Sequence, residues 1–144
     1  MKLPDGALIM LFFPGDGSVM GYKEEAARLH GCGQNCAQAV LCSCCEKYGL
    51  DPEIASRMTA FFGAGMRSGE VCGAATGALM ALGLEYGGED NRKSDKSVRF
   101  LRAFQKEFGS VRCRELIGAE GQKKKDLCPV LIAWASEYLE EELK

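Results

Sequence analysis

The stretch GEVCGAATGALMALG constrains the fold more than any other part of the chain, because most of its side chains are small. Gly73, Gly77 and Ala81 recur every fourth residue, so on a helix they form a stripe along one face. Neighbouring alanines widen this stripe. A face with so little side-chain bulk lets another helix approach its backbone closely. The stretch therefore predicts a closely packed helix over about residues 70–86.

Glycine-punctuated segments with helical periodicity follow one another along the chain. Asn35 and Gly49 mark the start and stop of one helix, and Asp51 followed by Pro52 marks the start of the next. Further helices are predicted over residues 21–30, over residues 94–109, and in two segments capped by Ser110 and Asp126. No segment alternates like a strand between turn signals. The sequence therefore predicts an all-α fold, a single compact bundle of six to seven helices.

Three of these helices carry apolar residues at helical spacing, and we expect those residues to face the core. The predicted buried faces are Ala37, Val40, Leu41, Cys44 and Tyr48; then Val98, Leu101, Phe104 and Phe108; and finally Leu127, Val130, Leu131, Trp134 and Tyr138. A chain of 144 residues is long enough to close such faces into one core without disulfide support.

The N-terminal residues do not share this helical pattern. The apolar run of residues 7–13 is too short to span a membrane, and the turn signal PGDG follows it directly. Only one lysine precedes the run, and no A-x-A cleavage site follows it. We expect residues 1–19 to be an appendage outside the core fold, and residues 20–144 to form the helical domain that carries the cysteines. No membrane insertion is expected.

Charge and histidine content limit the possible functions. The chain has 18 basic and 20 acidic residues and a net charge of -2, which gives no electrostatic basis for binding nucleic acid or an anionic membrane. The one histidine, His30, is a candidate metal ligand beside Cys32, although a solvated histidine at a helix end is favoured. No pair of catalytic carboxylates is evident, so whether the protein is an enzyme stays open. An exposed glycine-rich helix face would favour a homodimer.

The eight cysteines are the unusual feature of the composition. In a small secreted protein such a number indicates a disulfide framework. This chain is long enough to fold without one, and three of its cysteines crowd together in CSCC, where pairing is geometrically poor. We therefore expect a reducing, cytoplasmic location, with cysteines used for ligation or redox chemistry.

Four cysteines share one kind of position, the first turn of a predicted helix: Cys36 after Asn35, Cys72 after Gly69, Cys113 after Ser110 and Cys128 after Asp126. Unpaired N–H groups and the helix dipole favour a thiolate at this position, so we expect lowered pKa values for these cysteines. A thiolate is the form that ligates metal and attacks disulfides. The alternative for each residue is ordinary packing, because cysteine is among the most buried residue types.

The other four cysteines differ in position. Cys44 lies on the apolar face of its helix and is expected in the core, whereas Cys42 and Cys45 turn away from that face, so at least one of them is expected to be exposed. Cys32 is a candidate partner for Cys36 across a short loop. The C-x-x-C spacing of CSCC falls inside a helix and not at its first turn, which argues against a thioredoxin-like motif.

The spacing of Cys36, Cys72, Cys113 and Cys128 resembles that of the redox-active protein family named C_GCAxxG_C_C. The resemblance covers roughly residues 22–138, and its specific stretches are NCAQAV, GEVCGAATGALMALGLEYG, CRELIG and LCPVLIAWA. This chain has Cys-Gly where the family name has Gly-Cys. The resemblance implies a small redox-active protein of anaerobic prokaryotes, most of whose relatives have no assigned reaction.

The family is also similar to the iron–sulfur part of split-Soret cytochrome c. This similarity implies an iron–sulfur cluster on the four cysteines, with a two-iron two-sulfur cluster as one form. The haem part does not carry over, because the chain has no C-x-x-C-H attachment sequence.

Four interpretations follow for a four-cysteine helical redox domain over residues 20–144. The favoured one is an iron–sulfur cluster that transfers electrons to an unknown partner protein or senses redox state. The second is a thiol–disulfide protein without metal, in which Cys72 pairs reversibly with one of the other three cysteines. The third is a structural or regulatory zinc module with the same four ligands. The fourth is an interaction domain with inert cysteines.

Overall fold

The computed structural model describes residues 20–88, 91–118 and 124–143, and the elements in these ranges are helices apart from one isolated β-bridge. The α-helices are α2 (Tyr22–Gly31), α3 (Cys36–Cys44), α4 (Pro52–Met58), α5 (Gly73–Tyr86), α6 (Lys96–Phe108), α7 (Cys113–Ile117) and α8 (Lys124–Glu142). Shorter helical turns are η1 (Cys45–Tyr48), η2 (Gly65–Gly69) and η3 (Asn91–Lys93). The all-α fold predicted from the sequence is confirmed for these residues. The predicted appendage, residues 1–19, lies outside them.

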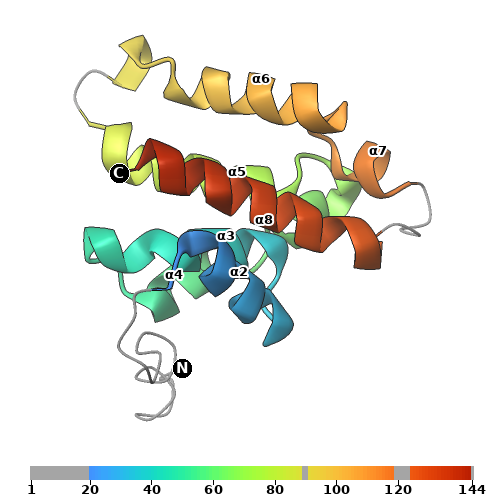
Figure 1. Ribbon diagram of the computed structural model, residues 1–144, viewed down its shortest axis with the longest axis horizontal. Coiled ribbons are helices and arrows are strands. Elements are labelled where there is room, and N and C mark those ends of the chain that lie inside the picture. Colours follow the sequence, from blue (N-terminus) through green and yellow to red (C-terminus); the bar gives the residue numbers. More distant parts are fainter. Residues whose placement is uncertain (1–19, 89–90, 119–123, 144) are drawn as a thin grey trace.

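Helices α5 and α8 run side by side through the middle of the molecule (Figure 1). Helix α6 lies along one side of this pair, and α2, α3 and α4 lie along the other (Figure 1). Helix α3 packs mainly against α5, whereas α2 packs against α8 and α3. The short helix α7 contacts both α8 and the η2 turn. The starts of α3, α5 and α7 thereby border one cavity.

The small-residue stripe of α5 faces α3, as the sequence predicted. A Cβ atom placed on Gly77 would lie 2.7 Å from the carbonyl oxygen of Ala37 and 3.2 Å from its Cα atom. Those distances are too short for a side chain, so the backbones of α3 and α5 can approach only because residue 77 is glycine. Ala74, Ala78 and Ala81 are fully buried. The predicted face of α3 is confirmed from Ala37 to Cys44, where its apolar residues are buried, but Tyr48 lies in η1 and is half-buried.

Aromatic side chains attach α6 to α8. Phe100 and Phe104 are fully buried, and their rings lie 5.9 and 5.6 Å from the Trp134 ring, between centroids. The stripe predicted for α6 was wrong at its first position, because Val98 is 44% exposed and Phe100 is buried instead. Phe100, Phe104 and Phe108 recur every fourth residue, and this face packs against Trp134. Val98 lies on another side of α6 and is therefore exposed.

Helix α8 is buried over a wider face than the sequence indicated, because it packs against α2, α3 and α5 as well as the aromatic rings of α6. Its well-buried residues are Leu131, Ile132, Ala135, Ser136 and Leu139, and Leu143 directly after the helix is buried as well. The prediction for Val130 was wrong, since this side chain is 49% exposed. Among the described residues, no helix is both long and apolar enough to cross a bilayer.

Two predicted helix starts are confirmed. The Asn35 side chain accepts a hydrogen bond from the N–H of Gln38 at 2.8 Å, and the Gln38 side chain accepts one from the N–H of Asn35 at 2.9 Å, which is a capping box. The Asp51 side chain caps α4, with Pro52 as its first residue. Gly49 ends η1 in the left-handed conformation (φ 69°).

The starts of α5 and α7 differ from the prediction. Helix α5 begins at Gly73, so Cys72 is its cap and not a residue of its first turn. Helix α7 is capped by Arg112, and Ser110 instead accepts a hydrogen bond from the N–H of Arg112 at 3.0 Å. Cys113 is therefore the first residue of α7.

Candidate functional site

One cavity of about 230 Å³ is lined by all four cysteines that the sequence singled out. They come from four elements: Cys36 begins α3, Cys72 caps α5, Cys113 begins α7 and Cys128 lies in α8. Cys72 and Cys113 are buried, and the other two are half-buried. Apolar Leu116, Ile117 and Leu131 and polar His30, Gln34 and Asn35 form much of the remaining lining. The fold thus gathers at one cavity four cysteines that are widely separated in the chain.

Gly73 makes room for the sulfur of Cys36. A Cβ atom placed on Gly73 would overlap Sγ of Cys36 and would lie 2.9 Å from the carbonyl oxygen of Phe62. A side chain at residue 73 would therefore displace a cysteine that lines the cavity. The sequence assigned Gly73 to helix packing alone, and this second role has no signal in the sequence.

A single β-bridge sets the separation of Cys72 and Cys113. Val71 and Arg112 pair in antiparallel orientation. On either side of this pair, the N–H of each cysteine donates to a carbonyl oxygen of the opposite segment, at 2.8 Å for Cys72 and 2.6 Å for Cys113. The two cysteine backbones are thus tied across the bridge, although neither segment has the residue alternation of a strand.

The turn that precedes Cys72 has a left-handed backbone. The φ angles of Ala64, Gly65, Met66 and Arg67 are 53°, 64°, 59° and 57°. For a residue other than glycine this conformation costs about 1–2 kcal/mol, so it persists only where surrounding contacts hold it. Ala64 lines the cavity, which makes this turn part of its wall.

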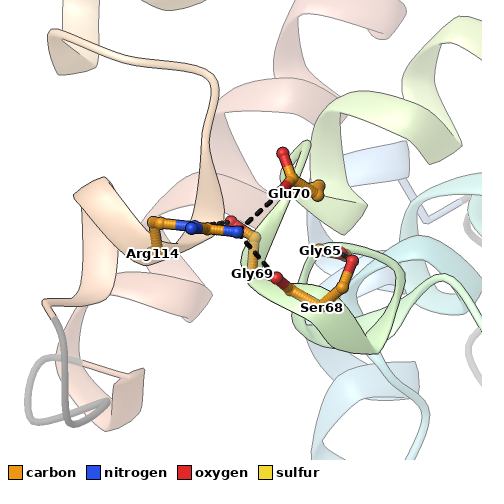
Figure 2. A network of polar contacts seen from close by, with 5 residues as sticks. All are labelled: Gly65, Ser68, Gly69, Glu70 and Arg114. Carbon is orange, nitrogen blue, oxygen red and sulfur yellow. Dashed lines mark hydrogen bonds and ion pairs between the residues drawn. The ribbon is translucent and has the colours of Figure 1, made fainter.

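Arg114 of α7 holds the left-handed turn from outside (Figure 2). Its guanidinium donates to the carbonyl oxygens of Gly69 at 3.2 Å and Ser68 at 3.0 Å, and pairs with the carboxylate of Glu70 at 2.6 Å (Figure 2). The Ser68 hydroxyl donates in turn to the carbonyl oxygen of Gly65 at 3.1 Å. Helix α7 therefore supplies both a cavity cysteine, Cys113, and the contact that keeps the opposite wall in place.

Burial controls the pKa of Cys72. The residue is 4% exposed, and removal from water raises the pKa of its thiol to about 12. The nearby Cys36 also raises this pKa, while the N–H groups of Ala75 and Ala74 at the start of α5 lower it. The prediction of a lowered pKa is therefore wrong for Cys72, because desolvation of the charged form outweighs the two backbone hydrogen bonds. Ligation of a metal here requires loss of the thiol proton.

Cys128 does not lie in the first turn of its helix, contrary to the prediction. Helix α8 begins at Lys124, so Asp126 is inside the helix and is not its cap. Pro129 follows Cys128 within α8 and has no N–H for the carbonyl four residues earlier. Cys36, Cys72 and Cys113 therefore lie at helix starts, whereas Cys128 does not.

The cysteines of the CSCC segment lie in the core. Cys42, Cys44 and Cys45 are 3%, 1% and 0% exposed, so Cys44 is buried as predicted and the expected exposure of Cys42 or Cys45 was wrong. Helix α4 and η1 cover this face of α3, which the periodicity of α3 alone could not reveal. Cys32 is exposed, and it does not line the cavity that holds Cys36.

The sequence raised His30 as a candidate metal ligand beside Cys32, but it lies at the cavity lined by the other four candidate cysteines, which Cys32 does not line. It is half-buried and lines the cavity, although a solvated position was favoured. Its Nδ1 lies 3.0 Å from the carbonyl oxygen of Gln34. The turn between α2 and α3 brings His30 back over the start of α3, and no feature of the residues around it indicated this.

The cavity cysteines surround a space and do not converge on one point. Among the described residues, no group of three or more His, Cys, Asp or Glu side chains is spaced to hold a single metal ion. The donor atoms at the cavity are nonetheless soft thiol sulfurs, which suit zinc, copper(I) and iron–sulfur centres.

The structure is a small helical bundle with four cysteines around one cavity, an arrangement that suits redox chemistry or metal binding. A family model described as "Putative redox-active protein (C_GCAxxG_C_C)" matches residues 34–142, so the chain belongs to this family. The resemblance drawn from the cysteine spacing is thereby confirmed. Comparisons with curated proteins and with solved structures find no match.

Proposed function

We propose that the protein transfers electrons or senses redox state through an iron–sulfur cluster held by Cys36, Cys72, Cys113 and Cys128. The observation that carries this proposal is their common cavity, to which each cysteine comes from a different element. Membership of a redox-active family supports it. Because thiol ligands have to stay reduced, a reducing, cytoplasmic location is part of the proposal.

The donor set and the size of the cavity both fit such a cluster. Four thiolates are the usual ligand set of iron–sulfur clusters. The cavity of about 230 Å³ is many times the roughly 10–15 Å³ that a cavity needs to admit one water molecule, so it suits a polyatomic group better than a single ion. When bound, the cluster supplies a site that accepts and releases an electron.

The residues around the cysteines have defined parts in this proposal. Leu116, Ile117 and Leu131 line the cavity and limit the access of water. The N–H groups of Ala74 and Ala75 point toward the sulfur of Cys72, and hydrogen bonds of this kind to cluster sulfurs raise a reduction potential. Burial of the thiol opposes this, since it disfavours negative charge at the same sulfur.

A reversible disulfide between Cys36 and Cys72 is the second candidate. The sulfur of Cys36 lies against Gly73, next to Cys72, and the two thiols are close enough for one to raise the pKa of the other. In this alternative the two thiols are oxidised together by exchange with an external disulfide, which is reduced to two thiols.

Metal analysis after purification without oxygen tests both candidates. Iron and acid-labile sulfide in matched amounts, with visible absorption that bleaches on reduction, are the expected result. Protein without iron or sulfide after anaerobic reconstitution would refute the cluster. Stoichiometric zinc would instead indicate a zinc module, and metal-free protein with a titratable Cys36–Cys72 pair would favour the disulfide.

A further inference from the structure

Four exposed apolar side chains lie on α4 and in the segment that leads from α4 to the cysteine cavity. Ile54, Met58, Phe61 and Met66, which we call the α4 patch, are 50%, 54%, 69% and 42% exposed. Ile54 and Met58 lie one turn apart on α4, and Met66 belongs to the left-handed turn whose Ala64 lines the cavity. Large apolar side chains gathered on a surface in this way mark an interaction site.

The charges along the α4 patch are separated into two groups. Arg57 in the last turn of α4 and Arg67 in the left-handed turn are exposed, and the Arg67 guanidinium lies 4.8 Å from the centre of the Phe61 ring. Asp51 and the half-buried Glu53 lie at the far end, where α4 begins. From residue 54 to residue 69 the chain has no acidic residue, although its net charge is -2. Glu70 follows directly, but its carboxylate is paired with Arg114, so the end of the patch beside the cavity is locally cationic.

Area and charge together favour a different protein over a second copy of this chain. At these exposed fractions the four apolar side chains offer roughly 400 Å², about half of the ~800 Å² that each partner buries in a stable complex. Transient electron-transfer complexes have smaller interfaces. A two-fold contact centred on Phe61 would also bring the Arg67 side chains of both copies together, which like charge disfavours.

We propose that the α4 patch, with Arg57 and Arg67, is the docking site for an acidic electron-carrier protein. Apolar contact would hold the carrier beside the cavity wall, and the two arginines would steer acidic groups on its rim. One electron leaves one protein and enters the other, and no covalent bond forms or breaks. This inference rests on the redox function proposed above.

Electron transfer with a reduced acidic flavodoxin as the probe tests the proposal. The anaerobically reconstituted protein is mixed with reduced flavodoxin or, separately, with reduced methyl viologen, which needs no docking site. Phe61→Ser and Arg57→Glu are expected to lower the second-order rate constant with flavodoxin by roughly tenfold at low salt. The rate with methyl viologen should be unchanged. Leu84→Ser and Val98→Ser are matched controls, because these side chains are 40% and 44% exposed on other helices.

Three results would overturn the docking site. The first is an equal rate with flavodoxin in the patch and control variants. The second is a rate with methyl viologen that falls as much as the rate with flavodoxin, which would mean structural damage. Sedimentation that shows a dimer broken by Phe61→Ser would assign the patch to a second copy instead.

Failure of the redox function has a different signature, because methyl viologen would then reduce nothing in the wild-type protein. In that case oxidised flavodoxin is titrated into the ¹⁵N-labelled protein. Amide shifts confined to the α4 patch and abolished by Phe61→Ser would uphold docking, and their absence would refute it.

Discussion

The cysteines of the cavity and those of the CSCC segment can be compared through Cys72 and Cys44. Burial raises the pKa of both thiols to about 12. The Cys44 thiol donates to the carbonyl oxygen of Leu41 at 3.5 Å, whereas Cys72 borders the cavity, where Cys36 and Cys113 influence its charge. The pKa therefore does not separate a candidate ligand from a core thiol. The surroundings of each sulfur separate the two thiols, because Cys72 borders the cavity and Cys44 bonds within its own helix.

The two groups also differ in what positions them. Two of the CSCC thiols bond to carbonyl groups three residues earlier in the chain, so local structure helps to place them: Cys44 to Leu41 and Cys45 to Cys42. The cavity cysteines are placed by contacts between elements, such as the β-bridge beside Cys72 and the glycine beside Cys36. Changes in packing should consequently disturb the cavity before they disturb the CSCC segment.

The largest contrast is expected when each thiol is removed. Cys72→Ala should lower the iron bound after anaerobic reconstitution by more than about tenfold, because it removes a proposed ligand. Cys44→Ala should leave iron per folded protein within about twofold, because this thiol is separated from the cavity and bonded to its own helix. Iron and sulfide assays on material shown to be folded by circular dichroism measure both. Equal iron loss in the two variants would remove the distinction between the groups.

Two glycines of α5 provide the next contrast. Gly73→Ala places a methyl group against Sγ of Cys36 and should cost about 3 kcal/mol of unfolding free energy, together with cofactor binding. At Gly83 a Cβ atom meets nothing within 4 Å, so Gly83→Ala should stabilise the helix by about 0.5–1 kcal/mol. Urea denaturation compares them. A Gly73→Ala variant as stable as wild type would contradict the crowding at Cys36.

Local features of the fold could be predicted from the sequence, because their signals lie within a few residues. The capping box at Asn35 and the stripe through Gly77 are of this kind. Val98 and Val130 were assigned to buried faces because helical spacing allows more than one apolar face, and only the helix packed opposite decides between them. The same limit explains Cys72, whose pKa is affected more by burial than by its helix start.

Part of the site had no local signal at all. The cavity wall at Ala64 depends on a left-handed turn of residues that are not all glycine, held by Arg114 from a segment far along the chain. His30 reaches the cavity through the shape of the turn between two helices. The four cysteines could be singled out by their spacing, but their common cavity follows from the tertiary fold.

Alkaline pH should reveal the burial of the core thiol. Because the pKa of Cys44 is raised to about 12, the folded protein keeps this proton between about pH 9 and pH 12 while the unfolded chain loses it. The free energy of unfolding therefore falls as pH rises, by up to about 1.4 kcal/mol per pH unit from this group. Cys44→Ala should make the slope shallower by that amount.

Cys32→Ala is the control for this slope, since its side chain is exposed in the folded protein. Anaerobic urea denaturation of wild type and both variants from pH 8.5 to pH 10.5 gives the slopes. Parallel curves for wild type and Cys44→Ala would show that the thiol is not buried as described.

The smallest effect concerns the outer contact of the cavity wall. Arg114→Ala removes two hydrogen bonds to backbone carbonyls and the ion pair with Glu70, but the two charged side chains are 53% and 42% exposed, so global stability should fall by only about 1 kcal/mol. The local effect should be larger, because the left-handed turn is strained and loses its outer support. Amide hydrogen exchange at residues 64–70 should therefore quicken while the CSCC amides keep their protection.

Lys23→Ala, which breaks the exposed pair with Glu137 at 3.6 Å, is the control and should change neither region. Unchanged exchange at residues 64–70 would mean that contacts within the turn stabilise it and that Arg114 does not.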